Sequence, residues 1–145
     1  MAVPSCRLVK AGASFTGKQG LDYRVGISAE SAGSSALHMQ IATLPPSAKA
    51  KAHKHEAHES AIHVLGGISG CWYGDHLEHH ATVKAGEFFY IPAGVPHLPY
   101  NPSATTPCVC VIARTDANEQ ESVVLLPELD AELAARGEPW LAVSA

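Results

Sequence analysis

Residues 86–101 read GEFFYIPAGVPHLPYN, and this stretch decides the fold. The apolar run 88–91 predicts a short strand, and Gly86 fits the turn before it. The segment 92–94, Pro-Ala-Gly, predicts a tight turn after the strand. This turn would deliver the next polar side chain, His97, to the interior of the molecule.

Two more histidines lie upstream, at the end of an extended stretch. His53 and His55 are two residues apart, and this spacing places both imidazoles on the same face of a strand. Glu59 follows four residues after His55 and can approach the same point from a turn or from the next strand. A carboxylate beside two neutral imidazoles suits a divalent ion, so these residues form a usable set of metal ligands.

Together the two segments resemble the two sequence motifs of the cupin superfamily. The second motif is a spaced series of Gly, Pro, Gly, His and Asn, and the matching positions here are Gly86, Pro92, Gly94, His97 and Asn101. The first motif ends in two His, a Glu and a Gly, which here are His53, His55, Glu59 and Gly66. Ser47 stands where the first motif opens with Gly, a difference that affects only a turn.

The resemblance covers roughly residues 35–115 and implies an all-β fold, a double-sheet jelly-roll β-barrel. It also implies that one divalent metal ion is held by four side chains: His53, His55, Glu59 and His97. Fe, Mn, Ni and Zn all fit such ligands, and the sequence does not choose among them.

The register of the first motif has an alternative. Cupin sequences often end this motif in Val-Leu-any-Gly, and residues 64–67 would match that ending with Gly67 rather than Gly66. The ligand position then moves from Glu59 to Ser60, which would be a poor ligand. In that case either a bulge keeps Glu59 in place, or His58 or no fourth protein residue completes the site.

Two further residues are weaker candidates for contact with the metal ligands or the substrate. His63 shares the face of Glu59 if the strand runs straight, although a hydrogen-bonded core histidine is an equal alternative. Tyr100 lies close to the His97 turn and is a candidate for the wall of the pocket, although aromatic residues are core residues by default.

The rest of the chain predicts many short strands and one helix. Residues 35–43 alternate, with Leu37, Met39 and Ile41 on one face and His38 and Gln40 on the other. Residues 61–65 and 69–73, joined by a Gly-Gly pair, predict a hairpin. A proline, early acids and a final Gly predict a short C-terminal helix over 127–137. We therefore expect an N-terminal arm at 1–22, the barrel at 23–126, and a C-terminal helix and tail at 127–145.

Composition narrows the functional class. The chain has 145 residues and nine His, a formal net charge of -4, and no run of basic residues, which argues against nucleic acid as a partner. No apolar stretch is long enough for a membrane span, and no signal peptide is visible, so we expect a cytoplasmic protein that does not bind membranes. Four cysteines without a CxxC pair predict buried free thiols.

A metal ion with open positions points to chemistry on a small, oxygen-rich molecule. We expect an enzyme, with a dioxygenase that uses O2 as the first hypothesis. The alternatives are a metal-dependent isomerase, decarboxylase or lyase that acts without redox chemistry, and a cupin that binds a small ligand without turning it over. By the same resemblance we expect a homodimer that pairs through sheet faces or exchanged N-terminal strands.

Overall fold

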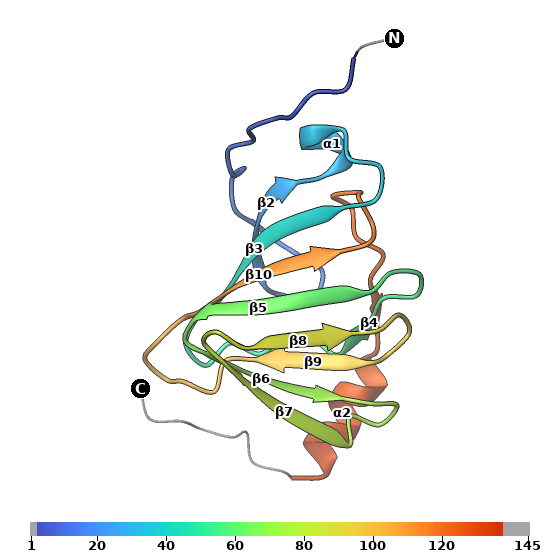
Figure 1. Ribbon diagram of the computed structural model, residues 1–145. Coiled ribbons are helices and arrows are strands. Elements are labelled where there is room, and N and C mark those ends of the chain that lie inside the picture. Colours follow the sequence, from blue (N-terminus) through green and yellow to red (C-terminus); the bar gives the residue numbers. More distant parts are fainter. Residues whose placement is uncertain (1–2, 138–145) are drawn as a thin grey trace.

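The computed structural model describes residues 3–137, which form eleven strands and two short helices (Figure 1). The strands are β1 (Phe15–Thr16), β2 (Asp22–Ile27), β3 (His38–Leu44), β4 (His53–Lys54), β5 (Ser60–Gly66), β6 (Ile68–Tyr73), β7 (His79–Lys84), β8 (Phe88–Ile91), β9 (His97–Tyr100), β10 (Cys108–Arg114) and β11 (Val124–Leu125). The helices are α1 (Ala29–Ala32) and α2 (Pro127–Ala135). The predicted tail beyond residue 137 lies outside the described residues.

The strands form two antiparallel sheets that face each other. One sheet has the order β1-β2-β3-β10-β5-β8, and the other has the order β11-β4-β9-β6-β7. Neighbours in each sheet come from distant parts of the chain, as in the pairing of β10 with both β3 and β5. The all-β, double-sheet jelly-roll fold predicted from the sequence is confirmed.

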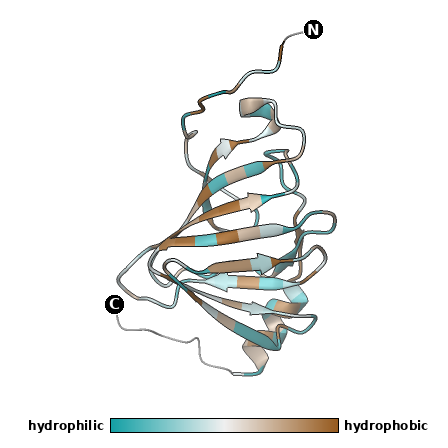
Figure 2. Cartoon of the chain, viewed as in Figure 1, coloured by the Kyte–Doolittle hydropathy of each residue, from teal (hydrophilic) through white to brown (hydrophobic). Residues whose placement is uncertain are grey.

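A core of small and aliphatic side chains fills the space between the sheets. Its buried members are Leu21, Tyr23, Ala42, Leu44, Ala50, Val64, Val83, Cys108 and Cys110. Figure 2 shows hydrophobic and hydrophilic residues alternating along several strands, as expected when one face of each strand is buried. The four cysteines are free, and three of them are buried.

The orientation of β3 differs from the usual pattern. His38 and Gln40 are buried and face the interior, whereas Met39, on the other face, is 48% exposed. The alternation of the sequence is therefore real, but its polar face points inward. This end of the barrel interior is consequently polar.

A second core lies under α2. The helix begins at Pro127, which has the backbone angle of a first helical residue and lacks an N–H that would go unused there. Leu129 and Leu133 are buried against the five-stranded sheet, next to Trp72 and Leu98. Each buried leucine stabilises the fold by about 1.5–3 kcal/mol. The predicted C-terminal helix is confirmed.

Two turns show where backbone geometry restricts the sequence. Gly67 joins β5 to β6 with φ of 79°, and a Cβ on it would overlap the backbone of Pro107 and Cys108. Both predicted strands are present, but the predicted hairpin is wrong. β5 pairs with β10 and β8 in one sheet, and β6 pairs with β7 and β9 in the other, so the turn at Gly67, which requires glycine, leads from one sheet to the other. Ser47, which replaces the motif's opening Gly, also lies in the left-handed region, with φ of 61°.

The first part of the chain extends away from the barrel. Residues 3–14 contain no helix or strand, and Figure 1 shows them beyond β2 and α1. β1, within the predicted arm, pairs with β2. No helix in residues 3–137 is long and apolar enough to cross a membrane.

Candidate metal centre

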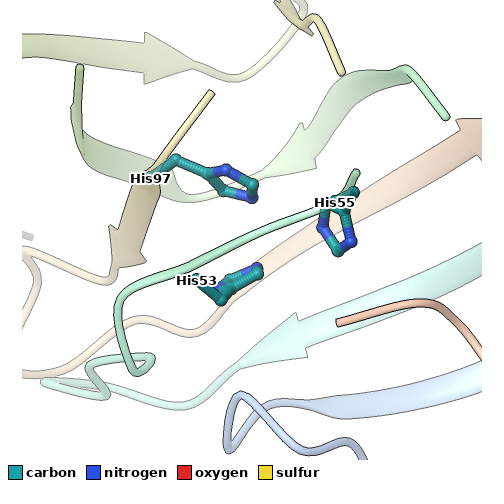
Figure 3. A group of neighbouring side chains, drawn as sticks. All are labelled: His53, His55 and His97. Atoms are coloured by element: carbon teal, nitrogen blue, oxygen red, sulfur yellow. The ribbon is translucent and has the colours of Figure 1, made fainter. Parts of the chain in front are cut away.

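Three histidines converge inside the barrel (Figure 3). His53 and His97 are partners in the pairing of β4 with β9, and their ring centroids are 4.3 Å apart. His55 follows β4, with its ring centroid 5.1 Å from that of His53 and 5.2 Å from that of His97. All three are buried, and one potential ligand atom of each lies within 4.8 Å of the others. The structure therefore brings together the three histidines predicted from the sequence.

Hydrogen bonds orient each of these rings. The Nδ1 atom of His53 lies 2.7 Å from the carbonyl oxygen of Lys51, and that of His97 lies 3.0 Å from the carbonyl oxygen of Val95. His55 Nδ1 lies 3.0 Å from the carbonyl oxygen of residue 122. Because a carbonyl oxygen only accepts, each Nδ1 carries the proton in the neutral ring, and Nε2 keeps a lone pair for a ligand.

Burial also keeps these rings neutral. Desolvation lowers the pKa of His53 from 6.5 to about 4, against the hydrogen bond from its ring to Lys51. Desolvation lowers the pKa of His55 as well, and it lowers that of His97 well below the usual value. Three neutral, oriented imidazoles with free lone pairs fit a divalent first-row metal ion such as Fe, Mn, Ni or Zn.

Glu59 does not join this group. It is exposed on the outer face of the barrel, where its carboxylate accepts a hydrogen bond from the Tyr90 hydroxyl at 3.0 Å. Residues 60, 62 and 64 of β5 point inward, so Ser60 occupies the place expected for the glutamate. The Gly67 register is the one adopted, and no bulge returns Glu59 to the interior.

A different carboxylate lies beside the histidines. Glu121 comes from the segment between β10 and β11, and its Oε1 atom is 3.3 Å from His55 Nδ1 and 3.2 Å from His58 Nε2. Burial raises the pKa of Glu121, but the His58 hydrogen bond and the charge of Arg114 outweigh it and bring the pKa to about 2. His55, His58 and Glu121 form a second group whose potential ligand atoms lie within 4.8 Å of one another.

Comparison with known proteins places these features in a family. The family described as "Cupin domain" matches residues 40–113, about half of the chain. The chain is a cupin. No curated protein matches it.

Solved structures share the fold of this cupin. KdgF from Halomonas sp. has a TM-score of 0.64 at 11% identity, covering 79% of this chain and 97% of that one. An uncharacterised double-stranded β-helix protein from Klebsiella pneumoniae has a TM-score of 0.60 at 15% identity, covering 77% and 88%. Oxalate decarboxylase from Bacillus subtilis has a TM-score of 0.69 at 17% identity, covering 94% of this chain and 37% of that one. At these identities the likeness concerns the fold alone.

The other predicted residues lie in different places. His58 is next to His55, with ring centroids 4.6 Å apart, whereas His63 and Tyr100 lie away from the three histidines of the cupin. His58 is buried, but it belongs to the second group with Glu121. His63 points outward from β5 and stacks on Phe88, with ring centroids 4.1 Å apart. Tyr100 is buried under α2, and its hydroxyl lies 2.7 Å from His80 Nε2. Neither His63 nor Tyr100 lines the cavity described next.

The histidines line a cavity of about 60 Å³ between the sheets. Most of its wall is apolar: Leu21, Ala42, Leu44, Ile62, Val64, Val83, Phe89, Ile91 and Ile112. The polar lining residues include the three histidines, Glu121, Gln40 and Ser60. The cupin therefore has a small apolar chamber with a candidate metal centre in its wall.

Proposed function

We propose that this cupin is a metal-dependent dioxygenase that uses O2 to cleave a small, oxygen-bearing molecule. The observation that supports it most directly is the neutral three-histidine cluster in the wall of a small, mainly apolar cavity. A redox-active metal ion held by His53, His55 and His97 would supply the one-electron chemistry that O2 requires.

The charge of the site favours particular substrates. Three neutral imidazoles do not reduce the charge of a divalent ion, so anionic oxygen donors bind well there. Enediols, diketones and phenols all provide such donors after loss of a proton. The apolar walls, from residues such as Leu44 and Phe89, would accommodate both O2 and the hydrocarbon part of such a substrate.

The two thiols and the phenol of the cavity are poor acid–base groups. A metal-dependent isomerase or lyase needs a protein group whose pKa lies near the working pH. Burial raises the pKa of both Cys71 and Cys110 to about 12, and it raises the pKa of Tyr23 far above its usual range. The dioxygenase therefore stays the first hypothesis, and a metal-dependent isomerase, decarboxylase or lyase, for which Glu121 is the carboxylate in the cavity, stays the alternative. The cytoplasmic location and the absence of nucleic-acid and membrane partners stay predictions.

The test combines metal analysis with oxygen uptake. The purified protein should contain close to one first-row metal ion per chain, and His55→Ala should lose it. An exposed matched control, His79→Ala, should keep it. Equal metal content in the wild type and in a double variant at His53 and His55 would contradict the centre.

The Fe-, Mn-, Ni- and Zn-loaded proteins are then each mixed with a diketone, an enediol, a phenol and a keto acid in an oxygen electrode. We expect oxygen uptake with a redox-active metal and none with Zn. Turnover of these compounds without oxygen uptake would support the isomerase or lyase class instead. Binding without any turnover would support a ligand-binding cupin.

A further inference from the structure

A second, larger chamber adjoins the first. It has a volume of about 270 Å³ and lies between the turn after β1 and the segment 119–123. Four residues line both chambers: Gln19, Tyr23, Gln40 and Glu121. The two chambers therefore lie next to each other, on either side of these four residues.

A buried arginine faces this outer chamber. Arg114, the last residue of β10, is 3% exposed, and its sheet neighbours are His38 and Ser60. Its Nε atom donates to the carbonyl of Asp116 at 3.2 Å, and its Nη2 atom donates to the carbonyl of Asn118. The remaining nitrogen, Nη1, forms an ion pair with Glu121, whose Oε2 atom lies 3.6 Å away, a distance longer than a hydrogen bond. Within residues 3–137 this nitrogen has no hydrogen-bond partner.

A buried amide lies beside the arginine. Gln40 is 4% exposed and lines both chambers, and its side chain makes no hydrogen bond within the described residues. Its direct partner on β10 is Ile112, so Arg114 is its diagonal neighbour, within reach of a long side chain. The Gln40 side chain therefore faces the chambers, where a polar group of a ligand can bind its amide.

The charges of the outer chamber balance, so recognition of a ligand there depends on particular hydrogen-bond donors and not on net charge. Its other charged residues are Lys18, Glu119 and Glu121. Glu119 accepts a hydrogen bond from Ser28 at 2.8 Å, and Glu121 is hydrogen-bonded to His58. Positive and negative groups are thus balanced, and the free donors of Arg114 and Gln40 distinguish this chamber. A planar carboxylate, with two acceptor oxygens, matches a guanidinium and an amide N–H.

We propose that the substrate of this cupin is a small carboxylic acid whose carboxylate binds Arg114 and Gln40 where the two chambers meet. A second oxygen, from a hydroxyl or keto group, then faces the three histidines, and the apolar part of the molecule fills the inner cavity. This inference rests on the proposed function, since it concerns the substrate of the same site.

The test measures binding without turnover. Zn-loaded protein is titrated by calorimetry with salicylate and with salicylamide, which share the ring and the hydroxyl but differ in the carboxylate. Charge-assisted hydrogen bonds predict that salicylate binds at least about tenfold more tightly. Arg114→Gln should remove this preference and leave salicylamide binding unchanged. Arg24→Gln makes the same chemical change on an exposed residue and should have no effect.

A second variant covers the chance that Arg114→Gln fails to fold. Gln40→Leu removes only the amide and should weaken salicylate binding by about threefold to tenfold, with salicylamide unaffected. Equal binding of the two ligands by the wild type would overturn the proposal. So would a preference for salicylate that survives both substitutions, or failure of salicylate, benzoate and phenylpyruvate all to bind.

The two proposals fail in different ways. Acid binding that depends on Arg114, without oxygen uptake by any metal-loaded form, would refute the dioxygenase and leave the carboxylate site intact. Oxygen uptake that is as fast with neutral diketones as with acids would refute the carboxylate site and leave the dioxygenase intact.

Discussion

His38 offers a test of how the interior of this barrel responds to acid. It is almost fully buried beside Arg114, and neither of its ring nitrogens has a hydrogen-bond partner within residues 3–137. Burial, and after it the charge of Arg114, lower the pKa of His38 from 6.5 to about 4. We expect His38→Leu to stabilise the protein and to make its stability less dependent on pH.

The magnitude follows from proton linkage. Between pH 7 and pH 5 the unfolded chain binds a proton at this histidine, and the folded chain does not, so stability is lost as the pH falls. A histidine with a folded pKa of about 4 and an unfolded pKa of 6.5 loses about 2 kcal/mol of unfolding free energy over this range. At pH 7, removal of an unpartnered buried polar group should add about 1–2 kcal/mol.

Urea titrations of the metal-free protein at pH 7, 6 and 5 measure both effects. The buried histidines of the metal centre contribute equally to the pH dependence of the wild type and of the variant. The difference between the two proteins in the slope of unfolding free energy against pH therefore isolates His38. His79→Leu, which alters an exposed histidine, should keep the wild-type slope. A His38→Leu protein that loses stability between pH 7 and pH 5 as steeply as the wild type would refute the reasoning.

Three other predictions test the site, the register and the assembly. Glu121→Gln should weaken metal binding by about tenfold or more in competition with a chelator, whereas Glu59→Gln should leave it unchanged; the opposite result would restore Glu59 as the ligand. Gly67→Ala should lower the unfolding free energy by about 2 kcal/mol or more, because φ is positive and the added Cβ meets backbone. Gly66→Ala, which meets open space, should cost less than about 0.5 kcal/mol, and equal effects in urea would contradict the Gly67 register. Light scattering should give a mass about twice the 15.2 kDa of one chain. The substitution Phe88→Asp, on the exposed sheet face, should halve this mass. A wild-type mass near that of one chain would argue against the homodimer.

Those parts of the fold could be predicted that depend only on residues close together in the sequence. Alternation predicted the strands, the glycine pair predicted the turn between β5 and β6, and Pro127 predicted the start of α2. The hairpin was wrong, because β5 and β6 belong to different sheets and pair with strands from other parts of the chain. Alternation does not say which face of a strand is buried. In β3 the usual assignment fails, because Gln40 lines the cavities while Met39 lies outside. A barrel that binds a polar ligand has a partly polar interior, so hydropathy alone misleads there.

The sequence predicted part of the site, namely the part that follows from the periodicity of a strand. His53 and His55 converge because a strand repeats every two residues, and this periodicity is visible in the sequence. The prediction of Glu59 as a metal ligand depended on the register of β5, because a shift of one residue moves every side chain of a strand to the other face. Glu121 comes from a segment without regular structure, and no fixed spacing ties it to the histidines. Only tertiary structure reveals that it contacts His55.

The position of the carboxylate also changes what the site can bind. A glutamate among the metal ligands would cancel part of the charge of the ion and weaken its attraction for anions. Here Glu121 contacts the far side of the His55 ring, at Nδ1, and shares its charge with His58 and Arg114. A divalent ion on three neutral histidines would then have no anionic protein ligand, and Nη1 of Arg114, at 3.6 Å from Glu121, would still have N–H groups to donate toward the outer chamber. Both features favour a molecule with two anionic oxygen groups, which is why the proposed dioxygenase and the proposed carboxylic acid substrate are consistent with each other.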